Sequence, residues 1–136
     1  MTTSERFPVG LLDTCVLIDL EQLKVTQLPL ITKISALTLA ELGQGLYAAH
    51  NSAERALRLE RLQLAEVNFE PLPFTADSAR RFTHMVGAVV AAGRNPKPRR
   101  LDLMIAAVAS VNKLPLFTRN AKDFIGLEQI VTVVAV

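Results

Sequence analysis

Four carboxylates in this sequence of 136 residues stand at positions that a solvated surface does not readily explain, namely Asp13, Glu41, Asp102 and Asp123. Oxygen ligands without His or Cys partners are the set that Mg²⁺ or Mn²⁺ prefers. An ion held by a few carboxylates keeps positions open for water and phosphate, and it lowers the pKa of an attacking water. Brought together, the four acids would suit metal-dependent hydrolysis of a phosphodiester without a protein nucleophile.

The first two acids each have a structural alternative. Asp13 directly follows a short apolar run and either caps the next turn or serves as a functional acid, two interpretations of equal weight. Glu41 follows Thr38 by three residues, which matches a capping box in which the glutamate reaches back to the first amide of the helix. Ser35 is an alternative cap. Taken alone, Glu41 is better explained by the capping box.

The other two acids differ in how strongly they indicate a site. Asp102 shares a predicted helix face with Ile105 and Ala106, at i+3 and i+4. That face must pack on a sheet, where an acid is costly unless it is paired, hydrogen-bonded or bound to a cation. Asp123 lies in a polar turn after a predicted strand, a pattern typical of a solvated loop. Asn120, in the same turn, offers a carbonyl oxygen to the same place.

The elements that must position these acids alternate between strand-like and helical patterns. Strands are predicted at residues 9–12, 32–35, 67–72, 115–118 and 130–136. Helices are predicted from residue 39, over 53–66, from a cap at Asp77 or Ser78 to Gly93, and over 101–113. This order predicts an α/β sandwich with a mostly parallel central sheet, in a single domain over residues 1–136. Functional groups gather beyond the carboxyl ends of such strands, where Asp13 and the segment after Phe117 lie.

Composition excludes several classes of protein. Half of the residues are hydrophobic and 21% are charged, which is too apolar for a disordered chain. A single cysteine excludes an intramolecular disulfide and a zinc site built from cysteines. The longest uncharged apolar stretch, residues 85–93, is far shorter than the ~20 residues of a spanning helix. Residues 1–6 lack the pattern of a signal peptide. We therefore expect a cytoplasmic protein without a membrane segment.

A basic stretch precedes Asp102. Residues 78–101 carry six Lys or Arg and no acid, and a Pro-containing loop holds four of them: Arg94, Lys97, Arg99 and Arg100. Such residues bind backbone phosphates, although each one is as well explained by a solubilising loop. The chain has no Trp and one Tyr, which disfavours a stacking platform for bases. Setting the four candidate acids aside leaves nine acids against 15 bases, so the net charge of +2 conceals an acidic pocket in a basic surround.

Four segments, residues 11–15, 35–42, 101–107 and 116–124, together resemble the motifs of PIN-domain ribonucleases. More narrowly, they resemble VapC-type toxins of type II toxin–antitoxin pairs. They fall in the family's order, and the resemblance covers nearly the whole chain. The resemblance implies a PIN-like α/β/α sandwich, an endoribonuclease activity, and Mg²⁺ (or Mn²⁺) in an acidic pocket.

Carried over by position, the resemblance makes Asp13 and Asp102 the metal ligands. It makes Glu41 an acid that holds metal or orients water. Many members place an aspartate at or near the position of Asn120, whereas here the nearest acid is Asp123, and either residue completes the site.

Thr14 and Thr118 match small hydroxyl positions, and with Asn120 they are expected to hydrogen-bond beside the acids. The family also implies homodimers and a cognate antitoxin whose tail or helix covers the active site. Asn120 keeps an alternative open, a catalytically inactive PIN-like scaffold that binds RNA or protein. A phosphoacceptor receiver domain is disfavoured because no aspartate follows the predicted strand at residues 67–72.

Overall fold

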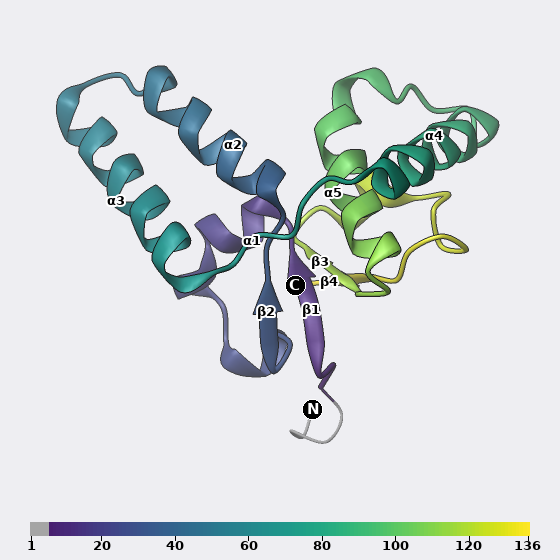
Figure 1. The fold of residues 1–136 in the computed structure, drawn as a ribbon, viewed down its shortest axis with the longest axis horizontal. Coiled ribbons are helices and arrows are strands. Elements are labelled where there is room, and N and C mark those ends of the chain that lie inside the picture. The colour runs from purple at the N-terminus through teal and green to yellow at the C-terminus, as the bar shows by residue number, and fades with distance from the viewer. Residues whose placement is uncertain (1–5) are drawn as a thin grey trace.

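A four-stranded parallel sheet lies at the centre of the fold, which a computed structural model describes for residues 6–136 (Figure 1). The strands are β1 (Val9–Leu12), β2 (Ile31–Lys33), β3 (Leu116–Thr118) and β4 (Val133–Ala135), in the spatial order β2-β1-β3-β4. Each neighbouring pair is parallel, with Leu12 opposite Phe117 in the central pair. The expected mostly parallel sheet is confirmed.

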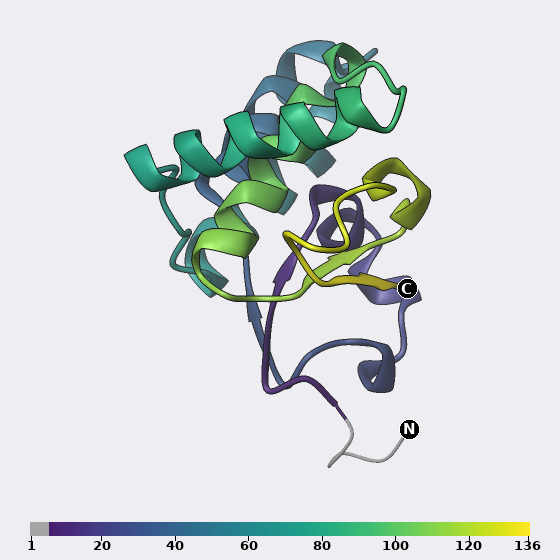
Figure 2. The ribbon, with the colours of Figure 1, turned by 90° about the vertical axis from the view of Figure 1, so that its right-hand side faces the viewer.

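Five α-helices surround the sheet: α1 (Thr14–Ile18), α2 (Ala36–Gly45), α3 (Ser52–Asn68), α4 (Ala76–Ala91) and α5 (Arg100–Val111). Figure 1 shows α2 and α3 as a hairpin on one side of the sheet and α4 with α5 on the other, and Figure 2 shows α4 lying across α5. The layers are those of an α/β/α sandwich, as predicted.

The two faces of the sheet build two hydrophobic cores because side chains alternate along a strand. Leu11 and Leu116 join the core beneath α4 and α5. Leu12 and Phe117, the next residue in each strand, join the core formed with α1, α2 and α3. Burial on both faces explains why these strands are continuous apolar runs.

Helix α5 is buried around most of its circumference. Ile105, Ala106 and Ala109 are fully buried, which confirms that the face shared with Asp102 packs inward. Gly93 ends the preceding helix with a φ of +76°, as its position after the periodic residues predicted. The N-cap of α4 is Thr75, however, and not the predicted Asp77 or Ser78.

Thr75 is the cap because its hydroxyl accepts the Ser78 amide hydrogen at 3.1 Å. Ser78 is instead a fully buried residue inside α4. The helix therefore begins at Ala76, two or three residues earlier than a cap at Asp77 or Ser78 would place it.

Three other predictions need correction. The strand at residues 67–72 is wrong because α3 continues through Asn68, and only Leu72 forms an isolated bridge, with Ser35. Nearby prolines lack the donor that a ladder requires. The last strand is shorter than 130–136, since the amides of Ile130 and Val131 bond to Leu127 in a turn. The basic loop holds a 3₁₀ turn at Lys97–Arg99 where no regular structure was expected.

No helix within residues 6–136 is long and apolar enough to cross a bilayer. The segment considered for a signal peptide lies, except for Arg6, outside the described residues.

Gly10 marks a close approach within the sheet. A Cβ added there would lie 2.5 Å from Phe117 Cε1, and the Phe117 ring is buried against the edge of Phe7. We expect Gly10→Ala to lower the free energy of unfolding by about 1–3 kcal/mol in urea titrations, since the buried Phe117 ring must shift to admit the added Cβ. Gly43→Ala in α2, where an added Cβ meets no atom within 4 Å, is the matched control and should be neutral or stabilising by up to about 1 kcal/mol. Equal losses in both variants would contradict the packing argument.

Candidate active site

Asp13 is the buried centre of the acidic site. It follows β1, and its amide donates to Phe117 O at 2.9 Å, so the carboxyl ends of β1 and β3 lie side by side. The side chain is only 4% exposed. Its Oδ1 accepts from the Thr14 amide at 2.9 Å and its Oδ2 from Thr118 Oγ1 at 2.8 Å. Asp13 is thus the cap of α1, which confirms that interpretation, and its role as a functional acid stays a prediction.

Glu41 faces the site instead of its own helix end. Its Oε1 accepts a hydrogen bond from Thr14 Oγ1 at 2.7 Å. The N-cap of α2 is Ser35, whose Oγ accepts from the Leu37 amide at 3.0 Å. The capping-box interpretation of Glu41 is therefore wrong, and the alternative cap at Ser35 is confirmed.

Thr38 is a site residue that the sequence argument used only as a possible cap. It is fully buried, and its Oγ1 lies 2.9 Å from Thr14 Oγ1. Because the single Thr14 hydroxyl proton goes to Glu41, Thr38 donates to Thr14. The spacing of three between Thr38 and Glu41 put both on one helix face and was the available signal.

Asp102 lies in the first turn of α5, half-buried. Burial and the negative charges of Asp13, Glu41 and Asp123 raise its pKa from 3.8 to about 6, against an opposing effect of Arg99. Three acids from other elements therefore act on this one carboxylate.

The pKa values of Asp13 and Glu41 are raised as well. Burial raises the pKa of Asp13, although the hydrogen bonds from Thr118 and Thr14 oppose that rise. Burial raises the pKa of Glu41 as well, with the Thr14 hydrogen bond opposing it and the charge of Asp13 adding to it. Within residues 6–136 no three His, Cys, Asp or Glu side chains form a ready-made set of metal ligands. The acids are coupled electrostatically without converging on one point.

Asp123 belongs to the 3₁₀ turn Ala121–Phe124 that follows β3. Its Oδ1 lies 3.2 Å from Arg99 Nη2, in an ion pair. Asn120 is exposed, and its backbone amide donates to Thr118 Oγ1 at 3.1 Å. Asn120 thus supports the threonine that holds Asp13, through its main chain.

The basic loop lies against this turn. Arg94 Nη1 donates to Lys122 O at 2.9 Å, while Lys97 and Arg100 are exposed. Of the four predicted RNA-binding residues, Arg99 forms an ion pair with one of the candidate acids, Asp123. No pattern in the sequence predicted this pair. Cys15 places its Sγ 3.6 Å from Asp13 Oδ2.

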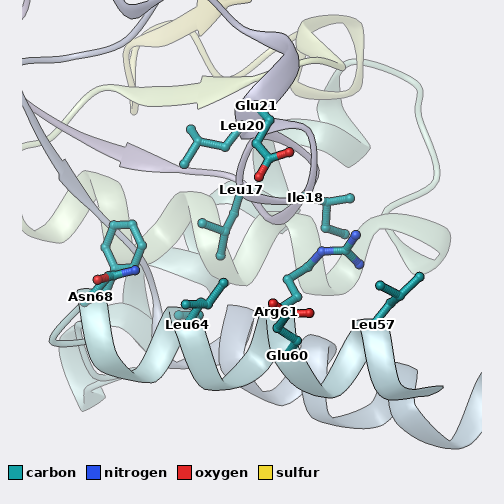
Figure 3. A pocket seen from close by; sticks show the side chains of 11 residues that line it. Leu17, Ile18, Leu20, Glu21, Leu57, Glu60, Arg61, Leu64 and Asn68 are labelled. Carbon is teal, nitrogen blue, oxygen red and sulfur yellow. The ribbon is translucent and has the colours of Figure 1, made fainter. Parts of the chain in front are cut away.

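A groove of about 400 Å³ lies between α1 and α3 (Figure 3). Figure 3 shows Leu17 and Leu64 pointing toward one another across it. Ile18, Leu57 and Leu64 on its walls are 43%, 63% and 53% exposed, so the groove presents unburied apolar surface. Helix α1 joins the groove to the acidic site, because Thr14 and Leu17 are one helical turn apart.

The chain is similar to a protein family, to a relative of known name and to solved structures. The family model described as PIN domain matches residues 10–127. Ribonuclease VapC5 of Mycobacterium tuberculosis is 37% identical over 122 residues, 88% of this chain and 87% of the relative. The crystal structure of VapBC-5, a member of the VapBC family of toxin–antitoxin systems from that organism, matches with a TM-score of 0.83 and 35% identity, covering 95% of this chain and 99% of the other.

Two further solved structures are similar. FitAcB from Neisseria gonorrhoeae has a TM-score of 0.69 at 25% identity and covers 92% of this chain and 95% of its own. VapBC-1 from nontypeable Haemophilus influenzae has a TM-score of 0.73 at 20% identity, covering 93% and 97%, and supports the fold alone.

The raised pKa of Asp102 predicts that its ionised carboxylate lowers the stability of the metal-free protein. The folded state binds this proton more tightly than the unfolded chain does, so stability falls as pH rises from about 4 to about 6. Asp102→Asn should therefore stabilise the metal-free protein at pH 7 by about 1 kcal/mol, a value reduced for partial exposure, and by little at pH 4. Urea unfolding in EDTA across this pH range measures the difference.

The matched control is Asp77→Asn, because Asp77 is 76% exposed in an ion pair with Arg80 on the surface of α4. It should change stability by less than about 0.5 kcal/mol at either pH. A destabilised Asp102→Asn at pH 7 would contradict the repulsion inferred for the acidic site.

Proposed function

The chain belongs to the PIN-domain family, and from this premise we propose that it is a VapC-type ribonuclease, the toxin of a type II toxin–antitoxin pair. It hydrolyses RNA phosphodiester bonds in the cytoplasm with Mg²⁺ or Mn²⁺ at the acidic site. The observation that carries the proposal is the burial of Asp13 in contact with Thr118, beside an Asp102 whose pKa is raised by burial and by the charges of Asp13, Glu41 and Asp123. The matched relative named a ribonuclease supports it over most of both chains.

The donor set fits a hard divalent cation. Mg²⁺ commonly binds through one or two carboxylates and fills its other positions with water and substrate phosphate. Asp13 and Asp102 would be those carboxylates, because burial raises the pKa of each and neighbouring negative charge raises it further. When bound, the ion lowers the pKa of the attacking water and neutralises charge on the scissile phosphate.

The hydroxyl residues orient the acids. Thr118 fixes Asp13 Oδ2, and Thr14 fixes Glu41 Oε1, so both carboxylates keep one oxygen in a set direction. Glu41, half-buried and with a pKa raised by burial, would orient the water and accept its proton. Asp123 adds negative charge to the site.

RNA would approach across the basic loop. Lys97 and Arg100 are exposed beside the start of α5, five and two residues before Asp102. Their contacts with backbone phosphates would be salt-dependent and tolerant of sequence. Arg94 and Arg99 are already bonded to the turn after β3 and border the site.

Loss of either proposed metal ligand should abolish cleavage. We expect Asp13→Asn and Asp102→Asn to lower the RNA cleavage rate at least about a hundredfold while the circular dichroism spectrum stays that of the folded protein. EDTA should abolish wild-type cleavage, and Mg²⁺ or Mn²⁺ should restore it. Asp77→Asn, remote and exposed, should retain full activity.

Undiminished cleavage in either variant or in EDTA would overturn the proposal. Wild-type protein that binds RNA in Mn²⁺ but never cleaves it would favour the inactive scaffold.

We further propose that the chain forms homodimers and is neutralised by a cognate antitoxin that seats an amphipathic helix in the groove between α1 and α3. Support comes from the solved relative at 35% identity, a toxin–antitoxin system, and from the exposed leucines of the groove. A segment in this groove would reach the acids by following α1 toward Thr14.

Leu64→Glu tests the groove, because it places a charge on an apolar wall. We expect it to weaken binding of the co-expressed antitoxin by tenfold or more, measured by calorimetry, with RNA cleavage unchanged. Val67→Glu, on the same helix but outside the groove and 82% exposed, is the matched control and should bind normally. Equal binding by both variants would place the antitoxin elsewhere.

A further inference from the structure

We propose that Asp123 holds the Arg99 guanidinium at the rim of the acidic site, where Arg99 binds a phosphate of the RNA, and that Asp123 is not a ligand of the metal. This inference rests on the proposed function and names two residues of the same site. It assigns Asp123 a positioning role that acts through Arg99.

The pair is partly withdrawn from water. Arg99 Nη2 and Asp123 Oδ1 are 3.2 Å apart, and the two side chains are 32% and 20% exposed. The Arg80–Asp77 pair on α4, by contrast, is about three-quarters exposed at both ends. A pair shielded in this way is screened less by salt and holds its geometry better than a surface pair.

The backbone around the pair is fixed at both ends. Arg94 bonds to the carbonyl of Lys122, the residue immediately before Asp123. The 3₁₀ turn Lys97–Arg99 contains Pro98 and leads directly into α5. Proline restricts the backbone, so the segment between these two attachments has little freedom. The backbone therefore holds Arg99, three residues before Asp102, in a restricted position beside Asp123.

The contacts of Asp123 differ from those expected of a ligand. Its described partner is Arg99, and a carboxylate oxygen engaged by a guanidinium is less available to a cation. The described residues contain no converging set of three potential ligands, as a site of Asp13, Asp102 and Asp123 would require. Two carboxylates suffice for Mg²⁺ that retains several waters.

The guanidinium keeps capacity for a second partner. It carries five N–H donors in a planar fork, and the contact with Asp123 uses one Nη. The remaining donors suit the oxygens of a phosphate, which Arg binds in a bidentate manner. Because Asp123 already restrains the long side chain, less conformational entropy is lost when the phosphate binds. Arg99 is thereby preorganised beside the scissile bond.

The experiment combines Arg99→Gln, Asp123→Asn and their double variant, with Arg80→Gln and Asp77→Asn as the matched exposed pair. Mn²⁺ affinity is measured by electron paramagnetic resonance without RNA, and kcat and KM are measured on a short fluorogenic single-stranded RNA. We expect Mn²⁺ dissociation constants within about fivefold of wild type in all of these variants, as for the loss of a nearby charge, and a loss of more than tenfold in Asp102→Asn.

For cleavage, we expect kcat to fall about tenfold or more in Arg99→Gln and in Asp123→Asn, with smaller changes in KM. The double variant should lose no more than Arg99→Gln alone, because the two residues act as one unit. Arg99→Lys should retain part of the activity, since it keeps the charge and loses the fork. The Arg80 and Asp77 variants should match wild type.

Mn²⁺ affinity that falls in Asp123→Asn as far as in Asp102→Asn would make Asp123 a ligand and overturn the inference. Additive losses of kcat, or faster cleavage by Asp123→Asn, would overturn it as well, since Asp123 would then act apart from Arg99 or compete for it. If wild-type protein cleaves no RNA, the proposed function fails together with the role of Arg99, and the Mn²⁺ titration still decides whether Asp123 is a ligand.

Discussion

The burial of the Asp13 carboxylate is the constraint on which the rest of the site depends. An acid that is 4% exposed is tolerated only with polar partners, and here they are the Thr14 amide and the Thr118 hydroxyl. Thr118 reaches Asp13 because β1 and β3 are parallel neighbours with Leu12 opposite Phe117. A slip of one residue would turn the Thr118 side chain to the other face of the sheet. The order and register of the strands therefore determine the site directly.

Helix α5 brings a further negative charge, Asp102, close to the other acids of the site. Its small residues, Ala106 and Ala109 among them, are fully buried and let the helix pack closely in the core. Asp102 at its start is thereby held half-buried near Asp13, and burial together with the neighbouring negative charges raises its pKa to about 6. A cation is the natural partner for such a cluster, and the positive charge of Arg99 already opposes the rise of this pKa. The charges that weaken the metal-free fold are the ones that would favour a divalent ion.

Sequence patterns predicted the features that local periodicity decides. The strand at residues 9–12 and the helix over 53–66 were predicted, and they are present as β1 (Val9–Leu12) and α3 (Ser52–Asn68). Glu41 was misjudged because Thr38 and Glu41 fit a local capping pattern, while their actual partner Thr14 lies 24 and 27 residues away. The strand at 67–72 failed because its first residues continue the hydrogen bonding of α3. The pairing of Arg99 with Asp123 joins two polar loops, and neither loop has a period that would predict the contact.

The net charge of +2 does not show how the charges act on a polyanion, because the effect of the Arg99–Asp123 pair depends on the distance of the polyanion from the pair. Far from the molecule, Arg99 and Asp123 cancel, so their pair contributes little to the attraction of a polyanion. That attraction falls to exposed bases such as Lys97 and Arg100. When a phosphate contacts the pair, the two charges no longer cancel. The Arg99 guanidinium presents its free N–H donors to the phosphate, while Asp123 Oδ1 is paired with Arg99 Nη2. An acidic site that must admit phosphate can in this way keep one fixed positive group at its rim without losing its own preference for a cation.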